Sequence, residues 1–170
     1  QLGQPVAFEL SLHNVDKPPL TEAETLRRAR QFSPWATLLL TTRPTFREKA
    51  RCFPGCTFVI GYDTAVRVVD PRYYAGEEDM RAALEEVRQH GCRFLVAGRA
   101  LDGAYRTLAD VPIPAPFRDL FAAIPESAFR VDISSTQLRA AALAEGMAAG
   151  EAPSAVGNLP GVKKPDRKRA

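Results

Sequence analysis

Short apolar runs alternate with amphipathic segments along most of this chain, and that alternation constrains the fold more than any other feature. The run Thr-Leu-Leu-Leu-Thr-Thr at residues 37–42 has three consecutive leucines at its centre, which suits a strand covered on both faces of a parallel sheet. The predicted strands cover residues 6–12, 37–42, 57–63, 93–97 and 127–131, and the predicted helices cover residues 21–32, 45–52, 77–90, 117–124 and 138–149. The pattern favours an α/β fold with a Rossmann-like, doubly wound parallel sheet.

The charge of the chain is unevenly distributed. The net charge is +3, but the last ten residues hold five basic side chains and one acid, so the remainder has a net charge of −1. We therefore expect an α/β domain over residues 1–149 and a basic, flexible tail over residues 150–170. Because the basic residues gather in the tail and not on a folded face, we do not expect the domain to bind nucleic acid.

The cysteines and the hydropathy indicate a cytoplasmic protein. Cys52 and Cys56 are four residues apart with no second pair after them, which argues against zinc, and the odd total with Cys92 fits free thiols in a reducing compartment. No apolar run approaches the roughly 18 residues of a transmembrane helix. We expect neither a metal site in the protein itself nor a membrane partner.

Polar residues follow two of the predicted strands at their carboxyl ends, where open parallel sheets bind ligands. Gly61 allows a ligand to approach the backbone, and the carboxylate of Asp63 can accept hydrogen bonds from ribose hydroxyls or an adenine amine. Arg99 follows the strand at residues 93–97 and is placed to meet a phosphate. The structural alternatives are a helix N-cap for Asp63 and a solvated loop arginine for Arg99.

The run Asp-Ile-Ser-Ser-Thr-Gln-Leu-Arg at residues 132–139 joins a predicted strand to an alanine-rich helix. Ser134, Ser135 and Thr136 would place hydroxyls and free backbone N–H groups at the start of that helix, where an anion is favoured. Arg139 lies one turn further on and could add a planar, bidentate donor. The alternative is that Ser134 or Ser135 only caps the helix.

This run resembles the Ile-Ser-Ser-Thr-x-Ile/Leu-Arg signature of the pyridine-nucleotide adenylyltransferases, in the HxGH nucleotidyltransferase superfamily. The likeness extends over residues 6–142. It implies that Gly61 and Asp63 match the family's Gly-x-Asp segment, which contacts the adenylate part of the nucleotide. It also implies that Asn14 and Lys17 face the mononucleotide, and that Tyr73 or the adjacent tyrosine stacks on the pyridine ring.

The superfamily's catalytic motif, Gly-x-Phe-x-Pro-x-His-x-Gly-His, is absent from this sequence. Its histidines bind the transferring phosphates, whereas His13 stands in Leu-His-Asn and His90 ends a predicted helix. The likeness begins at the family's second strand. We therefore expect an N-terminally incomplete domain that lacks the first strand and helix and is inactive alone, and we assign no catalytic residue.

The resemblance implies adenylyl transfer from ATP to nicotinamide or nicotinate mononucleotide, or a similar phosphate acceptor, as in NAD biosynthesis. Mg²⁺ would accompany ATP, and pyrophosphate would leave. The alternative is a non-catalytic nucleotide-binding or scaffold domain, which the missing histidine motif and the basic tail favour. The sequence leaves the acceptor, the oligomeric state and a lid role for residues 112–116 open.

Overall fold

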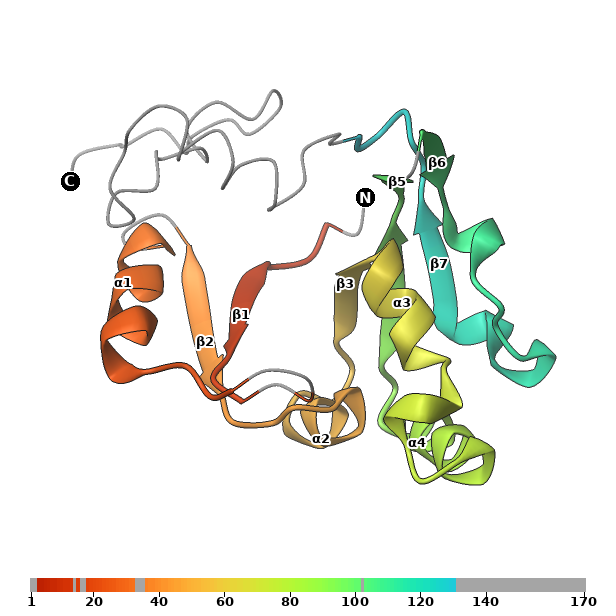
Figure 1. The fold of residues 1–170 in the computed structure, drawn as a ribbon, viewed down its shortest axis with the longest axis horizontal. Coiled ribbons are helices and arrows are strands. Elements are labelled where there is room, and N and C mark those ends of the chain that lie inside the picture. The colour runs from red at the N-terminus through yellow and green to blue at the C-terminus, as the bar shows by residue number, and fades with distance from the viewer. Residues whose placement is uncertain (1–2, 14, 16–17, 33–35, 102, 131–170) are drawn as a thin grey trace. The chain divides into compact units, whose positions relative to one another are not determined.

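The computed structural model describes residues 3–13, 15, 18–32, 36–101 and 103–130 (Figure 1). Within these ranges the chain is α/β, and its strands pair in parallel except in one short hairpin. The predicted α/β class with parallel strands is therefore confirmed.

The first part of the described chain is a parallel pair of strands joined through one helix. β1 (Ala7–Ser11) pairs with β2 (Thr37–Thr41). α1 (Glu22–Phe32) lies between them in the sequence and packs against β2. The hydroxyl of Thr21 accepts a hydrogen bond of 3.2 Å from the Glu24 N–H, which satisfies one of the unpaired donors at the start of α1. Every residue of α1 is described, and none is buried.

A second parallel sheet has the order β3–β4–β7. β3 (Thr57–Gly61) and β7 (Phe121–Ile124) lie on either side of the central strand β4 (Arg93–Ala97). The last residues of the three strands are paired with one another, so their carboxyl ends are level. This places whatever follows β3 and β4 at the same side of the sheet.

The helices around the second sheet begin and end where the sequence gives local signals. α2 (Phe46–Cys52) starts with a capping box, in which Thr45 and Glu48 satisfy each other's backbone N–H groups. α3 (Tyr62–Val68) follows β3 without a loop. A short 3-10 turn, η1 (Pro71–Tyr73), then leads to α4 (Glu77–Gln89).

The apolar core lies between β4, its neighbouring strands and the helices. The Phe94 ring stacks on Phe121 with ring centroids 4.8 Å apart and meets Phe46 edge to face at 5.2 Å. The predicted apolar face of α4 is confirmed, because its buried side chains include those that the sequence pattern selected. The largest fully buried side chains are Phe94, Met80, Leu84, Val87, Val96 and Cys92.

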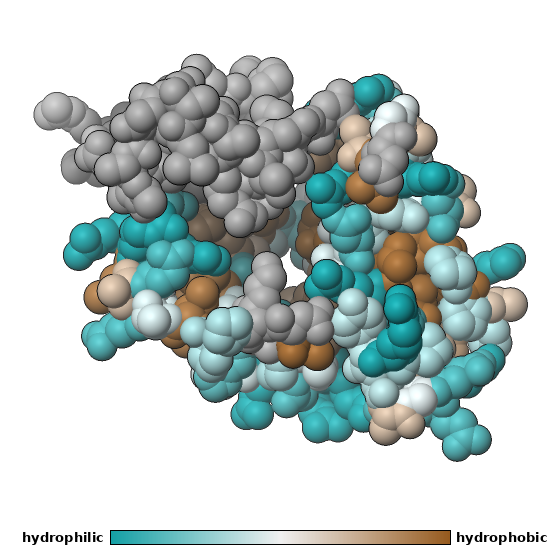
Figure 2. Space-filling view, in the orientation of Figure 1, coloured by the Kyte–Doolittle hydropathy of each residue, from teal (hydrophilic) through white to brown (hydrophobic). Residues whose placement is uncertain are grey.

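Some apolar strand residues are not covered by the described part of the chain. The exposed fractions of Phe8, Leu40 and Val59 are 38%, 50% and 63%. Figure 2 shows such hydrophobic residues, in brown, among hydrophilic ones on one face of the molecule. Burial in this fold is therefore concentrated around β4 and is not shared evenly by the strands.

The predicted helix at residues 117–124 is helical only as far as Leu120, and the predicted strand at residues 127–131 is wrong in its described part. A 3-10 helix, η3 (Ala115–Leu120), leads directly into β7, and residues 126–128 form a turn. The Phe-Ala-Ala-Ile segment has no strong local preference for a strand, but pairing with β4 and stacking of Phe121 on Phe94 select one. Tertiary contacts have overridden local propensity here.

The segment at residues 98–116, for which no helix or strand is predicted, contains regular structure. An antiparallel hairpin of β5 (Arg99–Leu101) and β6 (Ala104–Arg106) is followed by a 3-10 turn, η2 (Leu108–Asp110). Val111 after this turn is buried, as is Phe117 in η3. The segment around Pro112 is therefore anchored on both sides by core residues.

Candidate functional site

The carboxyl ends of β3 and β4 bring three of the predicted site residues to one place. Gly61 is the last residue of β3 and pairs with Ala97, the last residue of β4. Asp63 lies in the first turn of α3, which starts directly after Gly61. Arg99 opens β5 two residues beyond β4. Asp63 was predicted at a strand end and instead lies in the first turn of α3, and Arg99 begins β5.

Asp63 and Arg99 form an ion pair through Oδ2 and Nη1. Their side chains remain 44% and 39% exposed, so the pair is open to solvent and to a ligand. An exposed pair of this kind contributes at most about 1 kcal/mol to folding. The pairing therefore costs little to rearrange when a charged ligand arrives.

The two glycines near this pair differ in what their missing side chains leave free. A Cβ on Gly98 would lie 2.7 Å from Cε1 of Tyr105 and 2.8 Å from the Arg106 carbonyl oxygen, so only glycine lets the β5–β6 hairpin approach the end of β4. A Cβ on Gly61 would meet no atom of the described residues within 4 Å. Close packing thus explains why a glycine stands at position 98. At Gly61 the space that a side chain would fill is open.

The two adjacent tyrosines after α3 have different environments. The Tyr74 hydroxyl donates to the Val68 carbonyl oxygen at 2.8 Å, and burial raises the pKa of Tyr74 to about 12. Tyr74 packs against the core. Tyr73 is half-buried, and the Arg67 guanidinium lies 5.6 Å from its ring centroid. Tyr73 is therefore the less buried of the two rings in its contacts, and its described ring contact is with the Arg67 guanidinium.

Tyr73 and Asp63 lie at opposite ends of α3. Asp63 belongs to the first turn of α3, and Tyr73 comes after its last turn in η1. A seven-residue helix spans roughly 10 Å, which separates the backbones of the two residues along its axis. The described structure thus assembles Gly61, Asp63 and Arg99 at one place and leaves Tyr73 elsewhere.

The remaining predicted site residues lie outside the described residues. They are Asn14, Lys17, Ser134, Ser135, Thr136 and Arg139.

A polar cluster that the sequence did not predict joins β1, β2 and α2. Lys49 Nζ lies 2.9 Å from Glu9 Oε2, and the Lys49 side chain is only 10% exposed. The Thr41 hydroxyl donates to the other carboxylate oxygen of Glu9. A usable signal was present, because Lys49 lies between Phe46 and Ala50 on the apolar side of α2, where an unpaired charge would be costly.

The side chains that could bind a metal ion are those of His, Cys, Asp and Glu. The described residues contain no group of three or more His, Cys, Asp or Glu side chains that could hold a metal ion. Cys52 and Cys56 are exposed free thiols, whereas Cys92 is buried, and burial raises the pKa of its thiol. Within these ranges the protein therefore supplies no metal cage of its own.

No helix in the described ranges combines the length and the hydropathy needed to cross a membrane. Comparison of the chain with protein-family models, with curated proteins and with solved structures found no match.

Proposed function

We propose that this chain binds an adenine nucleotide at the carboxyl ends of β3 and β4, as part of an adenylyltransferase-type domain. The observation that carries the proposal is the Asp63–Arg99 pair, which lies beyond the ends of two adjacent parallel strands and stays open to solvent. Ligands of open parallel sheets bind at this side. A carboxylate and a guanidinium next to each other offer one group for a nucleoside and one for its phosphates.

The nucleoside would lie against the β3–α3 junction. The open space at Gly61 lets a flat base or a ribose approach the backbone, and Asp63 would accept hydrogen bonds from ribose hydroxyls or the adenine amine. Binding in this way draws Asp63 away from Arg99. Arg99 then becomes available to a phosphate oxygen. The ion pair is thus replaced by two contacts with the nucleotide, one from Asp63 to the nucleoside and one from Arg99 to the phosphates.

The resemblance also implies a phosphate-binding role for the run at residues 132–139, which lies outside the described residues. Ser134, Ser135 and Thr136 would donate hydroxyl and backbone N–H groups, and Arg139 would add a second guanidinium. Mg²⁺ would enter bound to the triphosphate, since Mg²⁺ is usually held by substrate phosphates with only one or two carboxylates. Asn14, Lys17 and Tyr73 are proposed to contact the mononucleotide, with Tyr73 requiring a ligand long enough to reach η1.

The proposed reaction is adenylyl transfer to a pyridine mononucleotide. An oxygen of the acceptor's 5′-phosphate forms a bond to the α-phosphorus of ATP, the bond from that phosphorus to the bridging oxygen breaks, and pyrophosphate leaves with the electron pair. The acceptor phosphate is already ionised, so no general base is required. We propose transfer only for a protein that also carries the superfamily's histidine motif, because this sequence has none.

The second candidate is a non-catalytic nucleotide-binding or scaffold domain. It is favoured by the contexts of His13 and His90, neither of which lies in the histidine motif. Both candidates bind a nucleotide at the same site, but the second candidate does not catalyse a reaction. The two candidates are therefore separated by an activity assay and not by binding.

The binding proposal is tested with the nucleoside and the phosphates as separate probes. Asp63→Asn should weaken adenosine binding, and it should strengthen tripolyphosphate binding because Arg99 loses its partner. Arg99→Gln should weaken tripolyphosphate binding about tenfold or more and leave adenosine unchanged. Arg93→Gln, at an exposed arginine of β4, is the matched control. Equal effects of Arg99→Gln and Arg93→Gln in calorimetry would overturn the proposed site.

Turnover is tested by pyrophosphate release with Mg²⁺. ATP and CTP are each supplied with nicotinamide mononucleotide, nicotinate mononucleotide and phosphopantetheine, using a protein that includes the histidine motif. We expect release with ATP and a pyridine mononucleotide, and its loss on Arg139→Ala. Binding of ATP without release from any pair would favour the scaffold alternative.

A further inference from the structure

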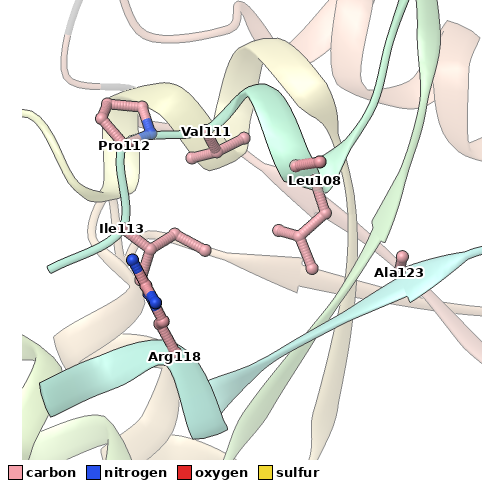
Figure 3. Close-up of a pocket in the computed structure, with 7 residues that line it drawn as sticks. Leu108, Val111, Pro112, Ile113, Arg118 and Ala123 are labelled. Atoms are coloured by element: carbon pink, nitrogen blue, oxygen red, sulfur yellow. The ribbon is translucent and has the colours of Figure 1, made fainter. Parts of the chain in front are cut away.

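A cavity separate from the Asp63–Arg99 site lies between η2, η3 and β7 (Figure 3). Its volume is about 500 Å³, within the range of small-molecule sites. Its lining is Leu108, Ala109, Val111, Pro112, Ile113, Arg118 and Ala123. None of these residues belongs to the proposed nucleotide site.

The cavity combines an apolar wall with a single cation. Figure 3 shows Arg118 extending from η3 toward Ile113 on one side, with Leu108 and Ala123 on the other. Leucine, valine, isoleucine and alanine side chains offer no hydrogen bonds to a ligand. Arg118 is the only charged residue among the described residues that line the cavity, so the ligand that fits has one anionic group and a hydrocarbon body.

Arg118 is available for such a ligand, unlike the arginines near it. Arg88 is held by Asp119 at 2.7 Å and by Glu85 at 2.7 Å, and Arg106 contacts Asp110. Across the described ranges, Arg118 has no ion pair or hydrogen bond through its side chain, and it is exposed. Its neighbour Asp119 contacts Arg88 at 2.7 Å and forms no ion pair with Arg118.

The walls of the cavity are preformed. Val111 and Phe117 are buried on either side of the proline-rich segment, and Pro112 and Pro114 restrict the backbone between them. The Thr107 hydroxyl accepts a hydrogen bond from the Ala109 N–H, which fixes the η2 turn that carries Leu108. A ligand would therefore meet a shaped site and would not have to order a loop.

We propose that this cavity binds a small amphipathic carboxylate, with the carboxylate on the Arg118 guanidinium and the hydrocarbon chain against Leu108, Val111 and Ile113. Planar, bidentate pairing of guanidinium and carboxylate supplies the direction, and burial of the chain supplies the remaining affinity. The proposal does not depend on the nucleotide site.

The test uses octanoate as the probe, with octanol and acetate as comparisons that lack the charge or the chain. The full chain is titrated, and backbone amide shifts are followed by NMR. We expect octanoate to shift amides of η2, η3 and β7 with a dissociation constant on the order of 1 mM, and acetate to bind more weakly. Arg118→Gln should weaken octanoate about tenfold and leave octanol unchanged, whereas Arg93→Gln should change neither.

A second pair of variants tests the cavity while Arg118 is kept. Ala123→Leu places a larger side chain in the cavity, and Ala122→Leu places the same side chain at the adjacent position of β7, which does not line it. Octanoate binding should be lost in the first variant and kept in the second. Unchanged binding in Ala123→Leu, or equal losses in Arg118→Gln and Arg93→Gln, would overturn the proposal.

Discussion

β2 and β4 are both five-residue strands with apolar centres, and they are buried to very different extents. In β4, Phe94 and Val96 are each 1% exposed, whereas in β2 Leu40 is 50% exposed. β4 has a paired strand on each side and α3 and α4 nearby, and β2 pairs only with β1 among the described strands. An apolar run therefore predicts a strand, but the neighbouring elements decide whether that strand becomes a core.

The same contrast extends to the helices. α4 buries four side chains and is tied to α2 by Arg47, which lies 2.7 Å from Asp79. α1 buries none, and its ion pairs stay on its own surface between Glu24, Arg27 and Arg28. The part of the chain around β4 thus has the features of a cooperative folding unit. The Glu9–Lys49 pair is a polar contact that joins the part around β1 and β2 to α2.

The largest expected effect separates the two strands directly. Phe94→Ala should lower the free energy of unfolding by about 3–5 kcal/mol, because it empties the centre of the aromatic cluster. Leu40→Ala should cost less than about 1 kcal/mol, because half of that side chain is already in water. Urea unfolding of both variants measures the difference, and equal losses would contradict the comparison.

A smaller loss is expected from the contact that joins the two parts. Lys49→Met should cost about 2 kcal/mol, because Glu9 would keep its charge in a half-buried place with only Thr41 beside it. Arg30→Met, at an exposed position of α1, is the control and should be nearly neutral. A double variant with Glu9→Gln should cost less than the sum of the single changes, so additive losses would show that the pair does not couple the two parts.

A loss of stability of comparable size should appear at alkaline pH, where Tyr74 in the core ionises. The folded protein holds the pKa of Tyr74 at about 12, above its ordinary 10.0, so the stability that this contributes is present below pH 10 and is lost as the pH rises toward 12. The loss should reach roughly 2 kcal/mol. Tyr74→Phe should lack it, so the variant should be less stable than the native chain at pH 8 and overtake it near pH 12. The free energy of unfolding of both proteins is measured in guanidinium from pH 8 to pH 12. The same pH dependence in both would contradict the raised pKa of Tyr74.

The smallest expected effect is at acid pH. The Arg47 guanidinium, and then the Ala75 N–H, lower the pKa of Asp79 below its usual value. Stability from this carboxylate is therefore present above about pH 4 and is lost as the pH falls through the lowered pKa. Asp79→Asn should flatten the acid limb of the stability curve slightly. A thermal melt series from pH 5 to pH 2 would show no difference if the contact between α2 and α4 is unimportant.

Local signals predicted most of the elements and not how they pair. α4 was predicted closely because its acids lead, its apolar face repeats with the helical period, and Gly91 with φ 69° ends it. β7 was missed because its pairing with β4 joins residues far apart in the sequence. The hairpin after β4 was missed because the close approach of Tyr105, which Gly98 allows, cannot be recognised from the local sequence.

The candidate site shows the same division. Gly61, Asp63 and Arg99 were found because parallel sheets place strand ends together, a rule that needs no side-chain geometry. The direct pairing of Asp63 with Arg99 depends on the hairpin and could not be read from spacing. Lys49 was missed because a charged residue on a helix is ordinarily solvated, and its contact with Glu9 comes from another element.

The most direct test of the central claim is hydrogen–deuterium exchange of the full chain with and without MgATP. The account predicts slower exchange in peptides that contain residues 61–64, 97–101 and 132–139, and unchanged exchange in α1, which serves as the internal reference. Protection confined to the basic residues 161–170, or no protection at the ends of β3 and β4, would contradict a nucleotide site at Asp63 and Arg99.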